Sequence, residues 1–186
     1  MLFLTYTGLR WGEAVGLRIR SVDMVRRRVL VQANAVNVRG RIIPGTPKSH
    51  EARSVPLPAF LAPPLMSLCA GKHNSSLVFG GGELFSATPT QGDGWFAGAR
   101  KRVSDAGPAF PPAVTLHDRR DTAASLAISV GANVKAVQRM LGHASAAMTL
   151  DTYADFFDDN LAARRRRGSQ HRSLSAWLGM DREFPP

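Results

Sequence analysis

The sequence predicts a mainly helical α+β domain that carries a small three-stranded antiparallel sheet. Apolar residues recur at helical spacing near both ends of the chain, whereas a Val-rich stretch between residues 28 and 57 alternates as strands do. Glycines at positions 8, 131 and 142 interrupt the helical patterns. The 186 residues are enough for one domain with a hydrophobic core.

The N-terminal part predicts a helix over residues 1–19 with a break at Gly8. Because this helix is apolar on most of its faces, we expect its large side chains to be buried; they are Leu2, Phe3, Leu4, Tyr6 and Leu9. Residues 28–36, 41–43 and 53–57 predict the three strands, with a turn at 44–49.

Further helices are predicted over residues 58–70, where prolines fix the start, and 95–106, which ends near Gly107. Three more follow at 117–130, 133–141 and 145–157. The C-terminal segment is basic from Arg164 onward and ends in a short apolar stripe of Leu174, Trp177 and Leu178.

The charge balance is strongly basic. The 24 Lys and Arg residues face 14 Asp and Glu residues, which gives a net charge of +10 and a pI near 11.1. Such an excess favours a polyanionic partner, and nucleic acid is favoured over an acidic membrane because the chain has no long apolar run. The lone cysteine, Cys69, excludes an internal disulfide and is typical of a buried residue in a reducing cytoplasmic compartment.

The polar residues between positions 115 and 153 form a pattern. His117 and Arg120 are three residues apart and share a helical face. Gly142 ends one predicted helix and leaves His143 in a turn, and Tyr153 follows ten residues later on the next helix.

Two earlier segments supply further candidates. Arg10 follows Gly8 and Leu9, and Glu13 is placed to hold its guanidinium by a hydrogen bond. Lys48 lies in a turn between predicted strands, where it is exposed enough to reach into a groove.

These residue types fit the cleavage of a phosphodiester bond. Arg10 and Arg120 would clamp the phosphate and stabilise the charge that develops during the reaction. Tyr153 would attack the phosphorus and form a covalent phosphotyrosyl link. Because that link preserves the bond energy, rejoining would need no ATP.

The remaining candidates would transfer protons or bind the phosphate. Lys48 is the candidate general acid for the leaving hydroxyl, His117 a general acid or base, and His143 a phosphate ligand. We expect no metal and no cofactor, since the histidines lack a third ligand with zinc spacing. The alternatives stay open: Tyr153 as an ordinary half-buried aromatic, Lys48 as a plain turn residue, and both histidines as core or capping groups.

The sequence resembles the tyrosine recombinases, also called the phage integrase family. The matching stretches are TGLRWGEAVGLR at 7–18, TPKSHEARSVPLP at 46–58, and the run from 116 to 153. The resemblance implies an integrase-like DNA breaking-rejoining fold and a tetramer acting on two DNA duplexes. It implies that Glu13 supports the catalytic residues. These catalytic residues are Arg10, Lys48, His117, Arg120, His143 and Tyr153.

The chain departs from the family pattern in three ways. Nothing precedes the first catalytic helix, so we expect the usual N-terminal core-binding domain to be absent, a catalytic domain over 1–163 and a tail over 164–186. Arg119 stands where the family usually has an apolar residue, and Asp121 where it often has histidine. We prefer Arg120 over Arg119 as the second arginine because only Arg120 shares a helical face with His117.

The predicted function is that of a site-specific DNA recombinase, or integrase, from a phage or another mobile element. It would cleave and rejoin DNA through a 3′-phosphotyrosyl intermediate and work in the cytoplasm, associated with the nucleoid. Two alternatives remain: a truncated or degenerate DNA-binding remnant without activity, and a type IB topoisomerase.

Overall fold

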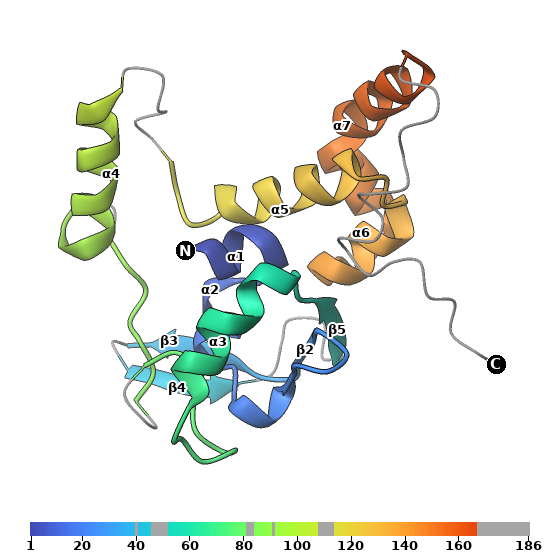
Figure 1. The fold of residues 1–186 in the computed structure, drawn as a ribbon. Coiled ribbons are helices and arrows are strands. Elements are labelled where there is room, and N and C mark those ends of the chain that lie inside the picture. Colours follow the sequence, from blue (N-terminus) through green and yellow to red (C-terminus); the bar gives the residue numbers. More distant parts are fainter. Residues whose placement is uncertain (40, 46–51, 81–83, 91, 108–113, 167–186) are drawn as a thin grey trace.

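The computed structural model describes residues 1–39, 41–45, 52–80, 84–90, 92–107 and 114–166, with side chains up to residue 159. Lys48 and the apolar stripe of the tail therefore lie outside the described residues. Helices dominate and a small antiparallel sheet accompanies them, which confirms the predicted fold class (Figure 1). Among the described residues, no helix is long and apolar enough to cross a membrane.

The first predicted helix is two short ones, α1 (Leu2–Thr7) and α2 (Trp11–Val15), and they separate at Gly8 as expected. Gly8 ends α1 in the left-handed conformation, with φ of +66°. An added Cβ there would lie 2.8 Å from a Leu141 methyl group, so glycine is required for space as well as for backbone angle. The expectation for Leu2 is wrong, because its side chain faces solvent and is 62% exposed.

The predicted sheet forms with different strands. The 3₁₀ turn η1 (Ile19–Ser21) leads into β1 (Val22–Asp23), which pairs with β2 (Arg28–Val31), and β2 pairs with β5 (Arg53–Pro56). Val29, Val31 and Val55 are buried on one face of this sheet. Its order is β1-β2-β5, so the predicted membership was wrong in one strand.

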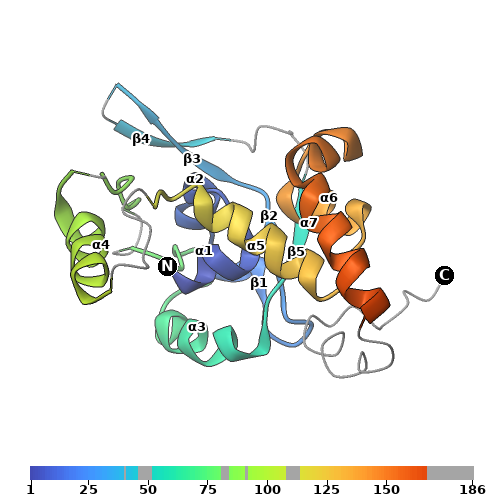
Figure 2. The ribbon, with the colours of Figure 1, turned by 90° about the horizontal axis from the view of Figure 1, so that it is seen from above.

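The predicted strand at 28–36 is split, and its second half belongs elsewhere. The strands β3 (Asn34–Val38) and β4 (Arg41–Gly45) pair only with each other and project as a hairpin (Figure 2). The two halves of the predicted strand differ in burial. Val29 and Val31 lie in the core, whereas Val36, Val38 and Ile43 of the hairpin are largely exposed. Alternating Val residues suit both environments, so the pattern alone did not separate the two strands.

The helical half is close to the prediction. It contains η2 (Ala59–Leu61), α3 (Ala62–Cys69), α4 (Gly94–Ala106), α5 (Asp118–Ser129), α6 (Val134–Leu141) and α7 (Ala146–Arg166). Cys69 at the end of α3 is only half-buried. The helix α5 packs on α1, α6 and α7, and α6 packs on β5, whereas α4 lies at the opposite end from α6 and α7 (Figures 1 and 2).

The last helix differs from its prediction in length and shape. It extends beyond the predicted end at 157, and the expected boundary at 163 falls inside it. Its backbone leaves helical geometry at Tyr153, where φ is −129° and ψ is 17°. Two helical segments therefore meet at Tyr153.

Candidate active site

The first part of the site is a buried carboxylate between two guanidinium groups. Glu13 in α2 is 1% exposed, and its carboxylate accepts a hydrogen bond from Arg10 Nη1 at 3.1 Å. The same carboxylate accepts two hydrogen bonds from Arg53, at 2.9 Å from Nη1 and 2.6 Å from Nη2. Arg53 Nε also donates to the Met140 carbonyl at 3.1 Å, so one side chain joins α2, β5 and α6.

The backbone at Arg10 fixes this arrangement locally. Arg10 is the N-cap residue of α2, and its backbone N–H donates to Glu13 Oε2 at 2.9 Å, as in a capping box. Burial raises the pKa of Glu13, but the hydrogen bonds and charge of Arg53 outweigh it, so the pKa lies below its ordinary value. Glu13 is therefore ionised at neutral pH and holds Arg10 with its guanidinium at the surface, where its side chain is 35% exposed.

Arg120 forms the second part of the site and is almost entirely buried. It is 4% exposed, and its Nη1 donates to the Gly8 carbonyl at 2.7 Å while Nη2 donates to the Leu141 carbonyl. Burial and the neighbouring charge of Arg10 lower the pKa of Arg120 to about 10, which leaves it cationic at neutral pH. The ends of α1 and α6 thus hold a fixed positive charge close to Arg10 and Arg53.

His143 and Tyr153 form the third part. Their rings lie parallel within 3°, with centroids 6.3 Å apart. His143 Nδ1 is 3.0 Å from the hydroxyl of Thr149, which is fully buried in α7. Burial and the nearby Arg120 lower the pKa of His143 to about 4, so the imidazole is neutral at pH 7.

Tyr153 is 3% exposed, and its hydroxyl donates a hydrogen bond of 2.7 Å to Asp121 Oδ1 on α5. Burial and this hydrogen bond raise the pKa of Tyr153 well above its ordinary value. The phenol is therefore protonated at neutral pH, and any reaction at its oxygen requires a proton acceptor.

The structure brings together five of the predicted residues, which are Arg10, Glu13, Arg120, His143 and Tyr153. His117 lies at the start of α5, where its side chain is exposed. No contact between the side chain of His117 and this cluster is seen within the described residues. Lys48 lies outside them.

Three neighbours of the cluster were not predicted as site residues. Arg53 lies inside the quoted stretch at 46–58, and Asp121 had been noted only as a departure from the family pattern. The sequence gives no indication that Thr149 belongs to the site, because threonine is common on helices. Arg53 and Asp121 act through contacts between elements distant in sequence, whereas Thr149 contacts His143 only six residues away.

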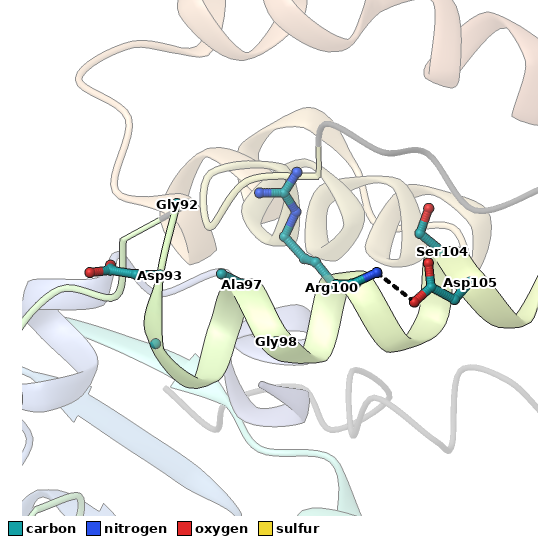
Figure 3. A pocket seen from close by; sticks show the side chains of 9 residues that line it. Gly92, Asp93, Ala97, Gly98, Arg100, Ser104 and Asp105 are labelled. Atoms are coloured by element: carbon teal, nitrogen blue, oxygen red, sulfur yellow. Dashed lines mark hydrogen bonds and ion pairs between the residues drawn. The ribbon is translucent and has the colours of Figure 1, made fainter.

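The hollow seen in the structure lies away from this cluster. A hollow of about 460 Å³ lies along α4, where the Lys101–Asp105 ion pair spans 3.0 Å (Figure 3). None of the cluster residues lines it. Within the described part of the chain, no three His, Cys, Asp or Glu residues are grouped to hold a metal ion.

These parts combine fixed cations, a neutral imidazole and a buried tyrosine with a proton acceptor. A family model described as the phage integrase family matches residues 1–159. The chain belongs to this family of tyrosine recombinases. The assignment agrees with the resemblance carried by the motifs around Arg10 and between His117 and Tyr153.

Among curated proteins, the chain is similar to the transposase of transposon Tn916 from Enterococcus faecalis, at 27% identity over 179 residues. It is equally similar to the transposase of transposon Tn1545 from Streptococcus agalactiae. These matches cover 90% of this chain but 44% of each relative, so the chain spans less than half the length of both.

Among solved structures, the chain is similar to the Tn1549 transposon integrase in complex with transposon right end DNA. The TM-score is 0.69 at 25% identity, over 90% of this chain and 57% of that one. It also shares its fold with XerA recombinase, with a TM-score of 0.54 at 24% identity over 91% of this chain and 55% of that one.

Proposed function

We propose that this chain is the catalytic part of a site-specific DNA recombinase that cleaves and rejoins strands through a 3′-phosphotyrosyl link to Tyr153. The observation that carries the proposal is the place of Tyr153, a buried tyrosine next to His143 and the guanidinium group of Arg120. A tyrosine that only filled the core would not need a buried cation near it.

The guanidinium groups would bind the scissile phosphate. Arg10 has an exposed guanidinium edge, and Arg120 is held rigidly by two carbonyl groups, so both charges are in place before DNA arrives. Preorganised donors of this kind stabilise the charge that builds up on the phosphate oxygens in the transition state. His143, neutral at pH 7, would donate a further hydrogen bond to the phosphate.

The other roles rest on the family resemblance. Lys48 would protonate the departing 5′-oxygen, and His117 would assist proton transfer once DNA is bound. Loss of either would slow the reaction by roughly 10²–10⁴-fold, as is usual for general acids and bases.

Double-stranded DNA is the proposed partner, supported by the net charge of +10 and by the DNA complex of the Tn1549 relative. We propose a tetramer on two duplexes, a catalytic domain over 1–163 with a C-terminal tail, and a cytoplasmic, nucleoid-associated location. DNA affinity should fall steeply with salt, and a flat response would contradict binding through phosphates. Light scattering of the protein on DNA measures the number of copies.

The decisive experiment traps the covalent intermediate. The chain is incubated with a pool of nicked duplexes of random sequence, in which cleavage releases a short strand and prevents rejoining. We expect a DNA adduct that survives denaturation and maps to Tyr153 by peptide mass spectrometry. Tyr153→Phe should form none, whereas Tyr6→Phe, which removes the other tyrosine, should form it normally.

Two outcomes would redirect the proposal. Equal behaviour of the wild type and Tyr153→Phe would reject strand cleavage by this chain and favour a DNA-binding role without catalysis. Relaxation of supercoiled plasmid without sequence preference would favour a type IB topoisomerase instead.

A further inference from the structure

Asp121 is the described residue that contacts the atom of Tyr153 expected to react. It lies on α5 directly after Arg120 and is half-buried, and Tyr153 lies on α7. The two helices pack against each other, and the hydrogen bond from Tyr153 Oη to Asp121 Oδ1 is 2.7 Å long. A general base must lie within about 2.6–3.2 Å of the atom whose proton it removes.

The neighbouring histidines are poorly placed for this proton. His143 stacks on the tyrosine ring with an interplanar angle of 3°, and its Nδ1 contacts Thr149. Among the described residues, no hydrogen bond joins an imidazole nitrogen of His143 to the Tyr153 hydroxyl, which donates to Asp121 instead. His117 is exposed at the start of α5.

We propose that Asp121 is the general base that takes the proton from Tyr153 during DNA cleavage. The inference rests on the proposed function and assigns one step in it. As the Tyr153 oxygen attacks, the O–P bond forms and the bond between phosphorus and the 5′-oxygen breaks with its electron pair on that oxygen. The tyrosine proton passes to Asp121, and a proton from the general acid, proposed to be Lys48, neutralises the 5′-oxygen. Rejoining reverses each transfer.

The electrostatics allow a carboxylate next to a phosphate. Three guanidinium groups and two carboxylates lie around the site, which leaves one positive charge to meet the single negative charge of a phosphodiester; they belong to Arg10, Arg53, Arg120, Glu13 and Asp121. His143 is neutral here. Among the other charged groups on α1, α5, α6 and α7 whose side chains are described, Asp118, Arg119 and the terminal amine of Met1 are half-buried. The rest are exposed; they are Lys135, Arg139, Asp151, Asp155, Asp158 and Asp159.

The first test measures the rate of adduct formation in a single turnover, with the nicked duplex that reacts best in the random pool. Asp121→Asn keeps an oxygen that accepts the tyrosine hydrogen bond but removes the basic carboxylate. We expect it to slow adduct formation by about 10²–10⁴-fold. Asp155→Asn, which removes an exposed carboxylate on α7, is the matched control and should react at the wild-type rate.

The pH profile separates a base from a merely structural group. The wild-type rate should fall in acid, and this decline should disappear in Asp121→Asn. Asp121→His should restore part of the rate, with a decline centred near the ordinary histidine pKa of about 6.5. A wild-type or faster rate in Asp121→Asn would overturn the proposal, because the hydrogen bond would then restrain the nucleophile.

A second measurement does not depend on activity. The ultraviolet absorbance of phenolate reports ionisation of the two tyrosines, and Tyr153→Phe identifies the contribution of Tyr6. Asp121→Asn should lower the pH at which Tyr153 ionises, and an unchanged titration would overturn the contact itself. If the titration shifts but the wild type forms no adduct, the proposed strand cleavage fails and the assignment of the base fails with it.

Discussion

The two sides of the candidate site are built differently. On the phosphate side, Arg53, Glu13 and Arg10 form a continuous ion-pair network, and two carbonyl groups fix Arg120. On the nucleophile side, the described part of the chain shows one hydrogen bond from the Tyr153 side chain, to Asp121, and one from the His143 ring, with Thr149.

This difference in hydrogen bonding suggests that the two sides have different roles. A rigid group of cations meets the transition-state charge without rearranging, which is where preorganisation helps most. In the proposed reaction, Tyr153 would have to leave its hydrogen-bonded position to reach a phosphorus atom, and it lies at the point where α7 leaves helical geometry. We therefore expect substitutions on the phosphate side to affect stability strongly, and those on the nucleophile side to affect mainly rate and pH dependence.

The largest effect on stability is expected from Glu13→Ala. It leaves the Arg53 guanidinium, whose side chain is 9% exposed, buried without a counter-charge. Removing one partner of a buried ion pair costs about 3–5 kcal/mol. Urea unfolding measures the change, and a loss near 1 kcal/mol or less would show that this side is less rigid than its contacts suggest.

The next largest loss of stability is expected from Gly12→Ala, which tests the packing of α2 against β3 next to the phosphate side. An added Cβ would lie 2.2 Å from Asn34 Oδ1 and 2.4 Å from the Ala35 carbonyl oxygen, so α2 and β3 would have to separate. Overpacking of this kind costs roughly 1–3 kcal/mol. Gly98→Ala in α4 is the control, because an added Cβ there would lie 3.5 Å from Arg102 Nη1, an ordinary contact. A helical alanine at this position should be neutral or stabilising.

Acid should weaken the fold through His143. Its pKa is about 4 in the folded protein, so between pH 6.5 and 4 the unfolded chain binds a proton that the folded protein does not. Stability is then complete above pH 6.5 and falls by roughly 1–2 kcal/mol toward pH 4, allowing for solvent screening. The lowered pKa of Glu13 adds a loss in the same direction at lower pH.

The comparison for this prediction is His143→Asn. Denaturant midpoints measured at pH 7, 6, 5 and 4 should fall less steeply for this variant than for the wild type. Parallel curves for the two proteins would show that another group accounts for the acid response.

The smallest effect is expected from Thr149→Val. The substitution preserves the shape of the side chain but removes the hydroxyl that contacts His143 Nδ1. It should cost about 1 kcal/mol and should make the His143 resonances shift or broaden in NMR spectra. An unchanged His143 spectrum would show that stacking on Tyr153 alone orients the imidazole.

Contacts between residues close in sequence were predicted well. Arg10 and Glu13 are three residues apart, and their pairing follows from helical spacing. The end of α1 at Gly8 and the end of α6 at Gly142 follow from the need for a left-handed residue at each cap.

Contacts between distant elements were not predicted. Arg53 meets Glu13 across 40 positions and Tyr153 meets Asp121 across 32, and both depend on how β5 packs on α6 and α5 on α7. The strand β1 has two residues, too few for an alternating pattern. The kink at Tyr153 was also not predicted, because the spacing of the apolar residues in this segment is that of an uninterrupted helix.

The hydrogen bonds that hold Arg120 affect its positive charge differently from the ion pair that holds Arg53. Glu13 immobilises Arg53 with an opposite full charge, whereas the carbonyls of Gly8 and Leu141 immobilise Arg120 with dipoles alone. These carbonyls lie at the C-terminal ends of α1 and α6, where helices carry partial negative charge. Arg120 is therefore held as firmly as a salt-bridged residue, while its positive charge is offset only in part, by dipoles.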